Sequence, residues 1–362
     1  MQKFKNFLAF FAEEWLMSLS LVGIVIVSLS LGTLPCYTPD QLIPIFLLWA
    51  LFVAVRGIEQ SGILTRISLY LEHGSMLAPK LVVISFLLSL ILSIDVTLVT
   101  LLPLVLGMQI KERDHLFLLV AFSAHIGAAL TPFGTPQNLF IFSFYQLEVI
   151  PFIQVMTPFS LGLFALFLLT AFLLPITRTN PTQKHKIRTD LLQGLLYLLT
   201  LTVVVLAVLR ICPWYAGFIA LLSALLFDKN ALKVDYPLLF TFLLFLGLAN
   251  ELKSVLAHYI EHPTHIFLLS SLLSQIISNV PSTLLLHQFT PEWEALLWGT
   301  NVGGFGTPVA ALANLITYRI YAAQNSKTQN MRFLLQMILW GFVVYTLGLF
   351  IFWLSRFFDM IP

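Results

Sequence analysis

The chain has 362 residues, of which 59% are hydrophobic and only 10% are charged. Soluble domains carry about 25% charged residues, so most of this chain must contact lipid or other apolar segments. The net charge of +2 is too small to indicate a nucleic-acid partner. Cys36 and Cys212 show no metal-binding or disulfide spacing, which excludes a cysteine-based framework.

The apolar segments predict a multi-pass membrane protein. The N-terminus lacks a clear cleavage site, so the run 15–35 is expected to be a retained first helix. Further apolar segments follow at 41–55, 77–110, 116–144, 152–176, 191–210, 213–227, 235–250, 264–288, 295–318 and 331–355. Segment 77–110 is too short for two spans, because two arms of about 14 residues reach only about 21 Å each. We therefore predict a re-entrant hairpin at 77–110 and a shorter one at 264–288.

Basic residues fix the expected orientation. With about nine full spans and two hairpins that do not cross, 16 of the 19 basic residues fall on one side of the membrane. The exceptions are Arg210, Lys253 and Arg356. The positive-inside rule makes the basic side cytoplasmic. The N-terminus is then expected inside and the C-terminus outside, in an all-α protein of the cell (plasma or inner) membrane.

One segment occurs twice. Residues 125–139 align without gaps to residues 301–315, with these identical pairs: Gly127/Gly303, Thr131/Thr307, Pro132/Pro308, Asn138/Asn314 and Leu139/Leu315. Each copy follows a predicted hairpin, and the two hairpins enter from opposite sides. We therefore predict two inverted repeats at 1–176 and 213–362, joined by a cytoplasmic basic loop and linker helix at 177–212. Broken helices are expected at 116–144 and 295–318.

The repeated segment predicts a binding site at mid-depth in the membrane. Pro132, Pro136 and Pro308 each remove a backbone donor and interrupt a helix. Freed backbone groups persist in lipid only where they line a polar cavity. There the N-termini of half-helices favour an anion, and unwound carbonyls can bind a cation. A single proline-kinked helix is usually only structural, whereas two matched breaks indicate a secondary transporter.

At these residues the sequence resembles the ion transporter superfamily, and most closely its divalent-anion/sodium symporter, citrate permease and arsenite permease branches. The motifs that carry the resemblance are SIDVTLVTLLP (93–103), IGAALTPFGTPQNL (126–139), SNVPSTLLL (278–286) and TNVGGFGTPVAALANL (300–315). The resemblance covers essentially the whole chain. It implies an elevator-type carrier, in which both hairpin tips and both helix breaks belong to one mobile domain. The remaining helices would form a scaffold that often dimerises.

The resemblance also nominates binding residues. In the family, hairpin-tip side chains and loop carbonyls hold cations and the carboxylates of the substrate. The implied substrate-binding residues are Ser93, Asp95, Thr97, Thr131, Pro132, Thr135, Asn138, Ser278, Asn279, Ser282, Thr283, Thr307, Pro308 and Asn314. The implied cation-coupling residues are Asp95, His125, Gly127, Asn279, Asn301 and Gly303, with Na⁺ expected where a hairpin tip meets a broken helix.

This chain departs from the family pattern in its first half. Ile94 stands where the family usually has asparagine, and His125 and Ala128 replace asparagine and glycine of the first broken helix. These changes weaken the expectation of sodium there. Asp95 is the one carboxylate expected deep in the membrane, and intramembrane charges are usually functional. Because imidazole titrates near pH 6.5, Asp95 and His125 are predicted to face each other as a proton-carrying pair, unless both are neutral and satisfied by backbone groups.

The predicted function is a secondary active transporter of a small anion, such as citrate, succinate or a similar oxyanion. No cofactor is expected beyond Na⁺ or H⁺ as the coupling ion. The expected partners are the substrate, the lipid bilayer and a second copy of the chain. A Na⁺/H⁺ antiporter or an arsenite efflux permease remains the alternative. A membrane-embedded enzyme is disfavoured, because the chain has no HExxH, GxSxG or P-loop motif.

Overall fold

The structure is a computed structural model that describes residues 14–64, 66, 76–108, 110, 112–174, 189–256 and 263–358. The described part contains 15 α-helices, together with three short 3₁₀ helices. The basic residues of segment 178–188, together with Lys3 and Lys5, lie outside the described residues. The described part is all-helical, as predicted.

Five described helices are long and apolar enough to cross a membrane. They are α3 (Pro39–Gln60), α9 (Val149–Leu173), α10 (Leu191–Val208), α12 (Tyr236–Leu256) and α17 (Lys327–Phe357). The helices α2 (Trp15–Leu31) and α11 (Phe218–Leu226) are shorter. Nine spans would require α2, α11 and both broken helices to cross once each, so that number stays a prediction.

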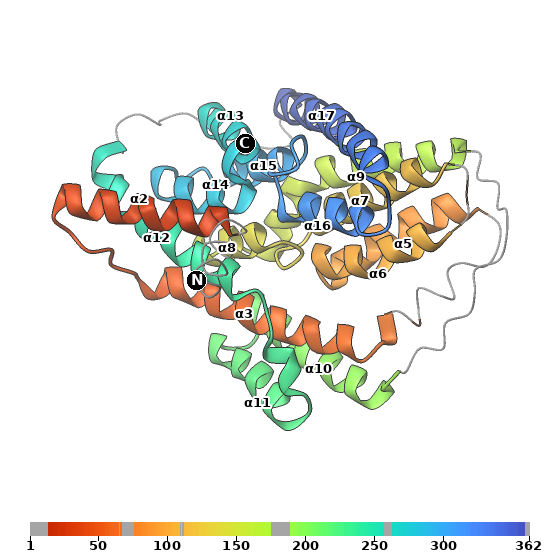
Figure 1. Cartoon of the computed structure of the whole chain (residues 1–362). Coiled ribbons are helices and arrows are strands. Elements are labelled where there is room, and N and C mark those ends of the chain that lie inside the picture. Colours follow the sequence, from red (N-terminus) through yellow and green to blue (C-terminus); the bar gives the residue numbers. More distant parts are fainter. Residues whose placement is uncertain are drawn as a thin grey trace, which may run out of the picture.

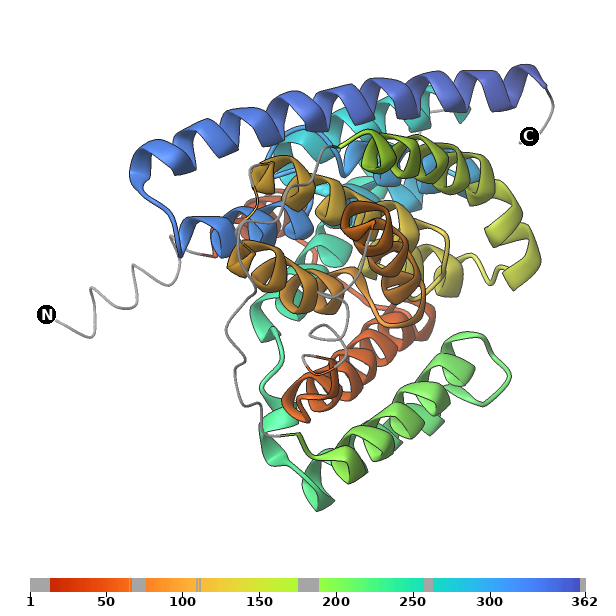
Figure 2. The same cartoon turned by 90° about the vertical axis from the view of Figure 1, so that its right-hand side faces the viewer.

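The helices pack in two groups. In the first, which we call the scaffold group, α2 packs on α12, and α10 and α11 pack on α3. The second group, the carrier group, contains α5–α9 and α13–α17, and Figure 1 shows it above α3, α10 and α11. The groups meet where α3 contacts α8 and where α12 contacts α14. In Figure 2, α17 runs along the outer edge of the carrier group.

Two helix pairs correspond in position to the expected hairpins. The first pair is α5 (Leu77–Ile91) with α6 (Ile94–Gly107), and the second is α13 (Pro263–Ile277) with α14 (Asn279–Leu286). Figure 1 shows the two pairs on opposite sides of the carrier group, with the broken helices between them. The first broken helix consists of α7 (Arg113–Ala129) and α8 (Pro136–Phe144), and the second of α15 (Trp293–Gly303) and α16 (Leu312–Ala322).

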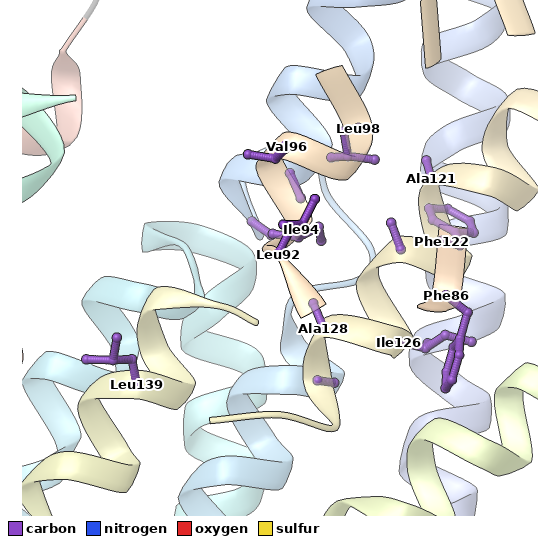
Figure 3. Close-up of a cluster of buried hydrophobic side chains, with 14 of the residues drawn as sticks. Phe86, Leu92, Ile94, Val96, Leu98, Ala121, Phe122, Ile126, Ala128 and Leu139 are labelled. Carbon is purple, nitrogen blue, oxygen red and sulfur yellow. The ribbon is translucent and has the colours of Figure 1, made fainter. Parts of the chain in front are cut away.

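Glycines bring the pairs close to the broken helices. A Cβ on Gly127 of α7 would lie 3.0 Å from the Cα of Phe86 on α5, and a Cβ on Gly303 of α15 would lie 2.8 Å from the Cα of Ser271 on α13. The first contact sits in an apolar cluster of α5, α6 and α7, in which Figure 3 shows Phe86 beside Ile126. This close packing holds the first helix of each pair against the helix that leads into the break.

Candidate functional site

Each helix break is held open by one asparagine. The Asn138 amide donates to the carbonyls of Ala128, Ala129 and Thr131 at 3.3, 3.1 and 3.2 Å. In the second break, the Asn314 amide donates to the carbonyls of Gly304 and Thr307 at 2.9 and 3.0 Å. These carbonyls lie at the helix break, where they lack the regular helical hydrogen bond. Leaving a buried carbonyl unpaired costs free energy. The two asparagines, predicted as substrate ligands, therefore stabilise the loops.

Each hairpin tip is fastened to the neighbouring break by a backbone hydrogen bond. The Ile94 N–H donates to the Gly134 carbonyl at 3.1 Å, and the Asn279 N–H donates to the Ala310 carbonyl at 2.9 Å. Figure 3 shows Leu92 and Ile94 of the first tip close to Ala128 at the end of α7. Each donor directly follows the serine of its hairpin tip, Ser93 or Ser278, and the two acceptors occupy matching positions of the aligned segments. The two halves therefore build the same local contact.

The second break carries an additional clamp. Gln275 of α13 donates from Nε2 to the carbonyls of Gly303 and Phe305, both at 2.8 Å, and its Oε1 accepts from the Thr307 N–H at 3.0 Å. Leu90 stands at the matching position of α5. The Thr131 hydroxyl, which matches that of Thr307, is buried and has no hydrogen-bond partner within the described part of the chain. The Gly303 carbonyl was predicted as a cation ligand, but here it already accepts from an amide.

We expect Gln275→Leu to lower the stability of the folded protein. The change introduces the leucine that stands at the matching position of the first half, Leu90. It leaves two carbonyls and one N–H of the second break without their side-chain partner. A lost partner of a buried polar group costs about 1–3 kcal/mol, so the apparent Tm in detergent should fall clearly. Gln154→Ala, on an exposed position of α9, is the matched control and should leave Tm unchanged. An unchanged Tm for Gln275→Leu would show that water replaces the clamp.

Four helix N-termini meet at one cavity. It is lined by Ile94 and Asp95 at the start of α6, by Thr135, Pro136 and Gln137 at the start of α8, by Ser278, Asn279, Val280 and Pro281 at the start of α14, and by Ala311, Leu312 and Ala313 at the start of α16. The N-terminus of a helix carries a partial positive charge and unpaired N–H donors. The cavity is therefore suited to an anion.

Asp95 and His125 line this cavity together. Asp95 is partly exposed to it, whereas His125 is buried and stacks on Phe305 with 4.3 Å between ring centroids. A Cβ on Gly304 would lie 2.7 Å from His125 Nε2, so the histidine of the first half contacts the break of the second. Among the described residues, no ion pair joins Asp95 to His125. Their action as a pair stays a prediction.

Asn301 stands at the position that matches His125, and it also reaches across to the other half. Its Nδ2 donates to Asn138 Oδ1 and to the Leu297 carbonyl, both at 2.8 Å. Its Oδ1 is buried without a hydrogen-bond partner among the described residues. The two breaks are thus joined by a direct hydrogen bond between the side chains of Asn301 and Asn138.

The remaining predicted residues lie around the cavity and do not line it. The hydroxyl groups of Thr97, Ser282 and Thr283 donate to carbonyls inside their own hairpins. Ser93 lines a second hollow, which shares Asp95 with the cavity. The others outside the lining are Thr131, Pro132, Asn138, Thr307, Pro308 and Asn314. Of the predicted substrate ligands, Asp95, Thr135, Ser278 and Asn279 face the cavity.

The sequence did not predict the roles of Gln137 and His287. Gln137 is 2% exposed and lines the cavity, and no other described residue gives its Nε2 a hydrogen-bond partner. Its place directly after Pro136 was the only available signal. His287 is likewise buried, with 2% of its surface exposed. It packs edge-on against Phe140 and Phe144, and its Nδ1 lies 2.8 Å from the Leu284 carbonyl.

Comparison with known proteins agrees with this arrangement. Residues 7–299 match the citrate transporter family, CitMHS. The chain belongs to the citrate transporter family. It is also similar to "Uncharacterized transporter MJ0456" of Methanocaldococcus jannaschii, with 34% identity over 80% of this chain and 83% of that protein. "Inner membrane protein YbiR" of Escherichia coli is 29% identical over 83% of this chain and 85% of that protein.

Membership of the citrate transporter family confirms several predictions. The protein is a multi-pass membrane carrier and not an enzyme. Its similarity to an inner membrane protein agrees with the predicted location in the cell membrane. A small-molecule substrate and the bilayer are therefore its partners. The family does not identify the substrate or the coupling ion of this chain.

Proposed function

We propose that this citrate transporter family protein is a secondary active transporter that moves a small anion, with citrate, succinate and similar carboxylates or oxyanions as first candidates. The observation that carries the proposal is the cavity where the N-termini of α6, α8, α14 and α16 meet. Helix dipoles and first-turn N–H groups supply favourable electrostatics for an anion without a buried lysine or arginine. Ser278 and Asn279 add polar side chains at the second hairpin tip.

The two inverted repeats are part of the proposal. Matched bonds of the hairpin tips, matched loop asparagines and matched glycine contacts support a common ancestor for residues 1–176 and 213–362. Hairpins that enter from opposite sides would make the repeats antiparallel in the membrane. The same site would then be reached from each side in turn.

Transport by an elevator-type movement of the carrier group fits the contacts between the two groups. Among the described residues, polar bonds between them include Arg210 to the Phe142 carbonyl at 3.1 Å and Gln288 to Asn250 at 3.0 Å. The scaffold helices α10 and α11 expose a row of leucine side chains, which suits lipid or a second copy of the chain. We propose that the scaffold forms a homodimer while the carrier groups move.

The cavity is proposed to open to the cytoplasm in this structure. Asp235, Arg319 and Glu14 line it together with the four helix starts. Arg319 belongs to the basic side that the positive-inside rule makes cytoplasmic. Asp235 caps the start of α12 by accepting from the Leu238 N–H at 3.0 Å. Substrate would therefore leave this state toward the cytoplasm during uptake.

Cation coupling is proposed because an anion that enters against a negative membrane potential needs a co-transported positive charge. Asp95 and His125 are the titratable groups that the cavity offers at depth. Because Gln275 occupies carbonyls of the second break, coupling through the first half or by protons is favoured. The alternative is a Na⁺/H⁺ antiporter, or an arsenite efflux permease, which the same two residues would also serve.

Uptake into proteoliposomes tests the proposal. We expect a carboxylate or oxyanion to accumulate when a Na⁺ or pH gradient is imposed, and the imposed gradient that drives it names the coupling ion. His125→Asn introduces the amide that Asn301 has at the matching position of the second half. This variant should lose the pH dependence of uptake. If pH dependence persists in this variant, His125 carries no proton. Ion exchange without any anion uptake would favour the antiporter.

A further inference from the structure

Two of the four helices that begin at the cavity are hydrogen-bonded to the scaffold group at their far ends. In the predicted orientation α8 and α14 run from the cavity toward the outer surface, whereas α6 and α16 run toward the cytoplasm. Arg210 Nη2, just after α10, donates to the Phe142 carbonyl in α8 at 3.1 Å. Gln288, just after α14, donates to Asn250 Oδ1 of α12 at 3.0 Å. Both contacts between the groups therefore lie on the outer side.

Arg210 caps the C-terminus of α8. The Phe142 carbonyl lies in the last turn of this helix, where carbonyls have no N–H partner within the helix, and it also accepts from the Leu147 N–H at 3.0 Å. The C-terminus of a helix carries a partial negative charge, which a cation stabilises. The Arg210 guanidinium also lies 5.6 Å from the centroid of the Phe142 ring, within the range of a cation–π interaction. One residue of α8 thus binds Arg210 in two ways.

The backbone at Arg210 indicates that its side chain has a specific task. Arg210 follows the end of α10 with a φ of 59°, a left-handed conformation that glycine or asparagine usually adopts after a helix. Asp40 and Ser143 line a hollow together with Arg210, but among the described residues Arg210 forms no ion pair. In this state its partner is therefore α8, and the contact needs the ends of α8 and α10 side by side.

From these contacts we propose that Arg210 is a positioning residue that holds the carrier group in the state whose cavity opens to the cytoplasm. The inference rests on the proposed function, because it assigns this contact to one of two transport states. In an elevator movement α8 travels with the carrier group while Arg210 stays with the scaffold group, so the contact breaks in every cycle. A contact that exists in one state lowers the free energy of that state alone and so raises its population.

Labelling of one cysteine in the cavity tests this proposal. The reporter is Val309→Cys, because Val309 lines the cavity, belongs to the carrier group and offers no polar side chain to a substrate. It is placed in the full-length chain with Cys36→Ser and Cys212→Ser, and the protein is reconstituted in one orientation. A maleimide that cannot cross the bilayer is then added to the outer face or to the cytoplasmic face of the protein, and the labelling rate is measured on each side.

We expect Arg210→Gln to raise the labelling rate from the outer face about tenfold, since the loss of one hydrogen bond from a charged group changes an equilibrium by about that factor. Arg210→Lys keeps a positive charge at the end of α8 and should label more slowly than Arg210→Gln. Arg356→Gln is the matched control, because Arg356 bonds to Thr264 Oγ1 within the carrier group at 3.3 Å. It should label like the protein that carries the reporter alone.

The side from which the cysteine is labelled distinguishes a positioning role from a purely structural one. A structural role would lower the Tm of Arg210→Gln without changing the ratio of the two labelling rates. Arg210 is exposed, so the variant is expected to fold, and thermal unfolding verifies this. An unchanged ratio in folded Arg210→Gln, or an equal change in Arg356→Gln, overturns the role of Arg210. Labelling needs no substrate, so this result is independent of anion uptake. Absence of uptake for every anion would instead overturn the proposed function.

Discussion

Asp95→Asn is expected to abolish uphill uptake while leaving the protein folded and able to bind its substrate. Asp95 lies in the first turn of α6, where the helix N-terminus stabilises a negative charge, and its carboxyl group faces the cavity. The amide keeps the shape of the side chain but cannot carry a proton or balance a co-transported cation. A tenfold effect requires a change of only about 1.4 kcal/mol in free energy. We therefore expect gradient-driven uptake to fall by more than tenfold.

Two measurements separate loss of coupling from loss of binding. Counterflow exchange of labelled for unlabelled substrate needs no net cation movement, so it should persist in Asp95→Asn proteoliposomes. Asp235→Asn is the matched control, because Asp235 lines the same cavity but is exposed at the start of α12. It should keep gradient-driven uptake. Wild-type accumulation by Asp95→Asn, with an unchanged dependence on Na⁺ and pH, would contradict a coupling role for Asp95.

The positions of the helix breaks could be predicted from the sequence because proline and a repeated motif mark them. The structure ends α7 at Ala129 and resumes the helix at Pro136, within the predicted segment 116–144. The second break lacks a proline at the matching resumption point, where Leu312 begins α16. Its position was nevertheless predicted, because residues 301–315 repeat residues 125–139. Local backbone chemistry therefore marked the first break, and the internal repeat marked the second.

The composition of the cavity could not be predicted in the same way. Which of many serine, threonine and asparagine side chains face a cavity depends on how far each helix is rotated, and apolar segments carry little periodic signal for that rotation. Thr97, Ser282 and Thr283 bond within their hairpins instead. Gln137 and Gln275 are missed because their roles depend on segments distant in the sequence or on a cavity that forms only in the folded chain.

The largest loss of stability is expected for Asn138→Ala. The Asn138 amide serves three carbonyls of the first break, and its Oδ1 accepts from Asn301 of the second. Alanine leaves these four buried groups without that partner, at about 1–3 kcal/mol for each group that finds no other. We expect the free energy of unfolding to fall by at least about 3 kcal/mol, enough to prevent purification of a folded carrier at 37 °C.

The order of three variants tests this explanation. Asn314 serves two carbonyls, and no hydrogen bond to the other half is present for it among the described residues. Asn314→Ala should therefore lower the apparent Tm less than Asn138→Ala. Asn230→Ala, at an exposed position of the 3₁₀ helix Lys229–Leu232, should lower it least. Asn138→Asp keeps the acceptor for Asn301 but loses the amide donor, so it should be as damaging as alanine. A stable Asn138→Asp protein would show that the bond between the two breaks, and not the loop carbonyls, is what Asn138 contributes.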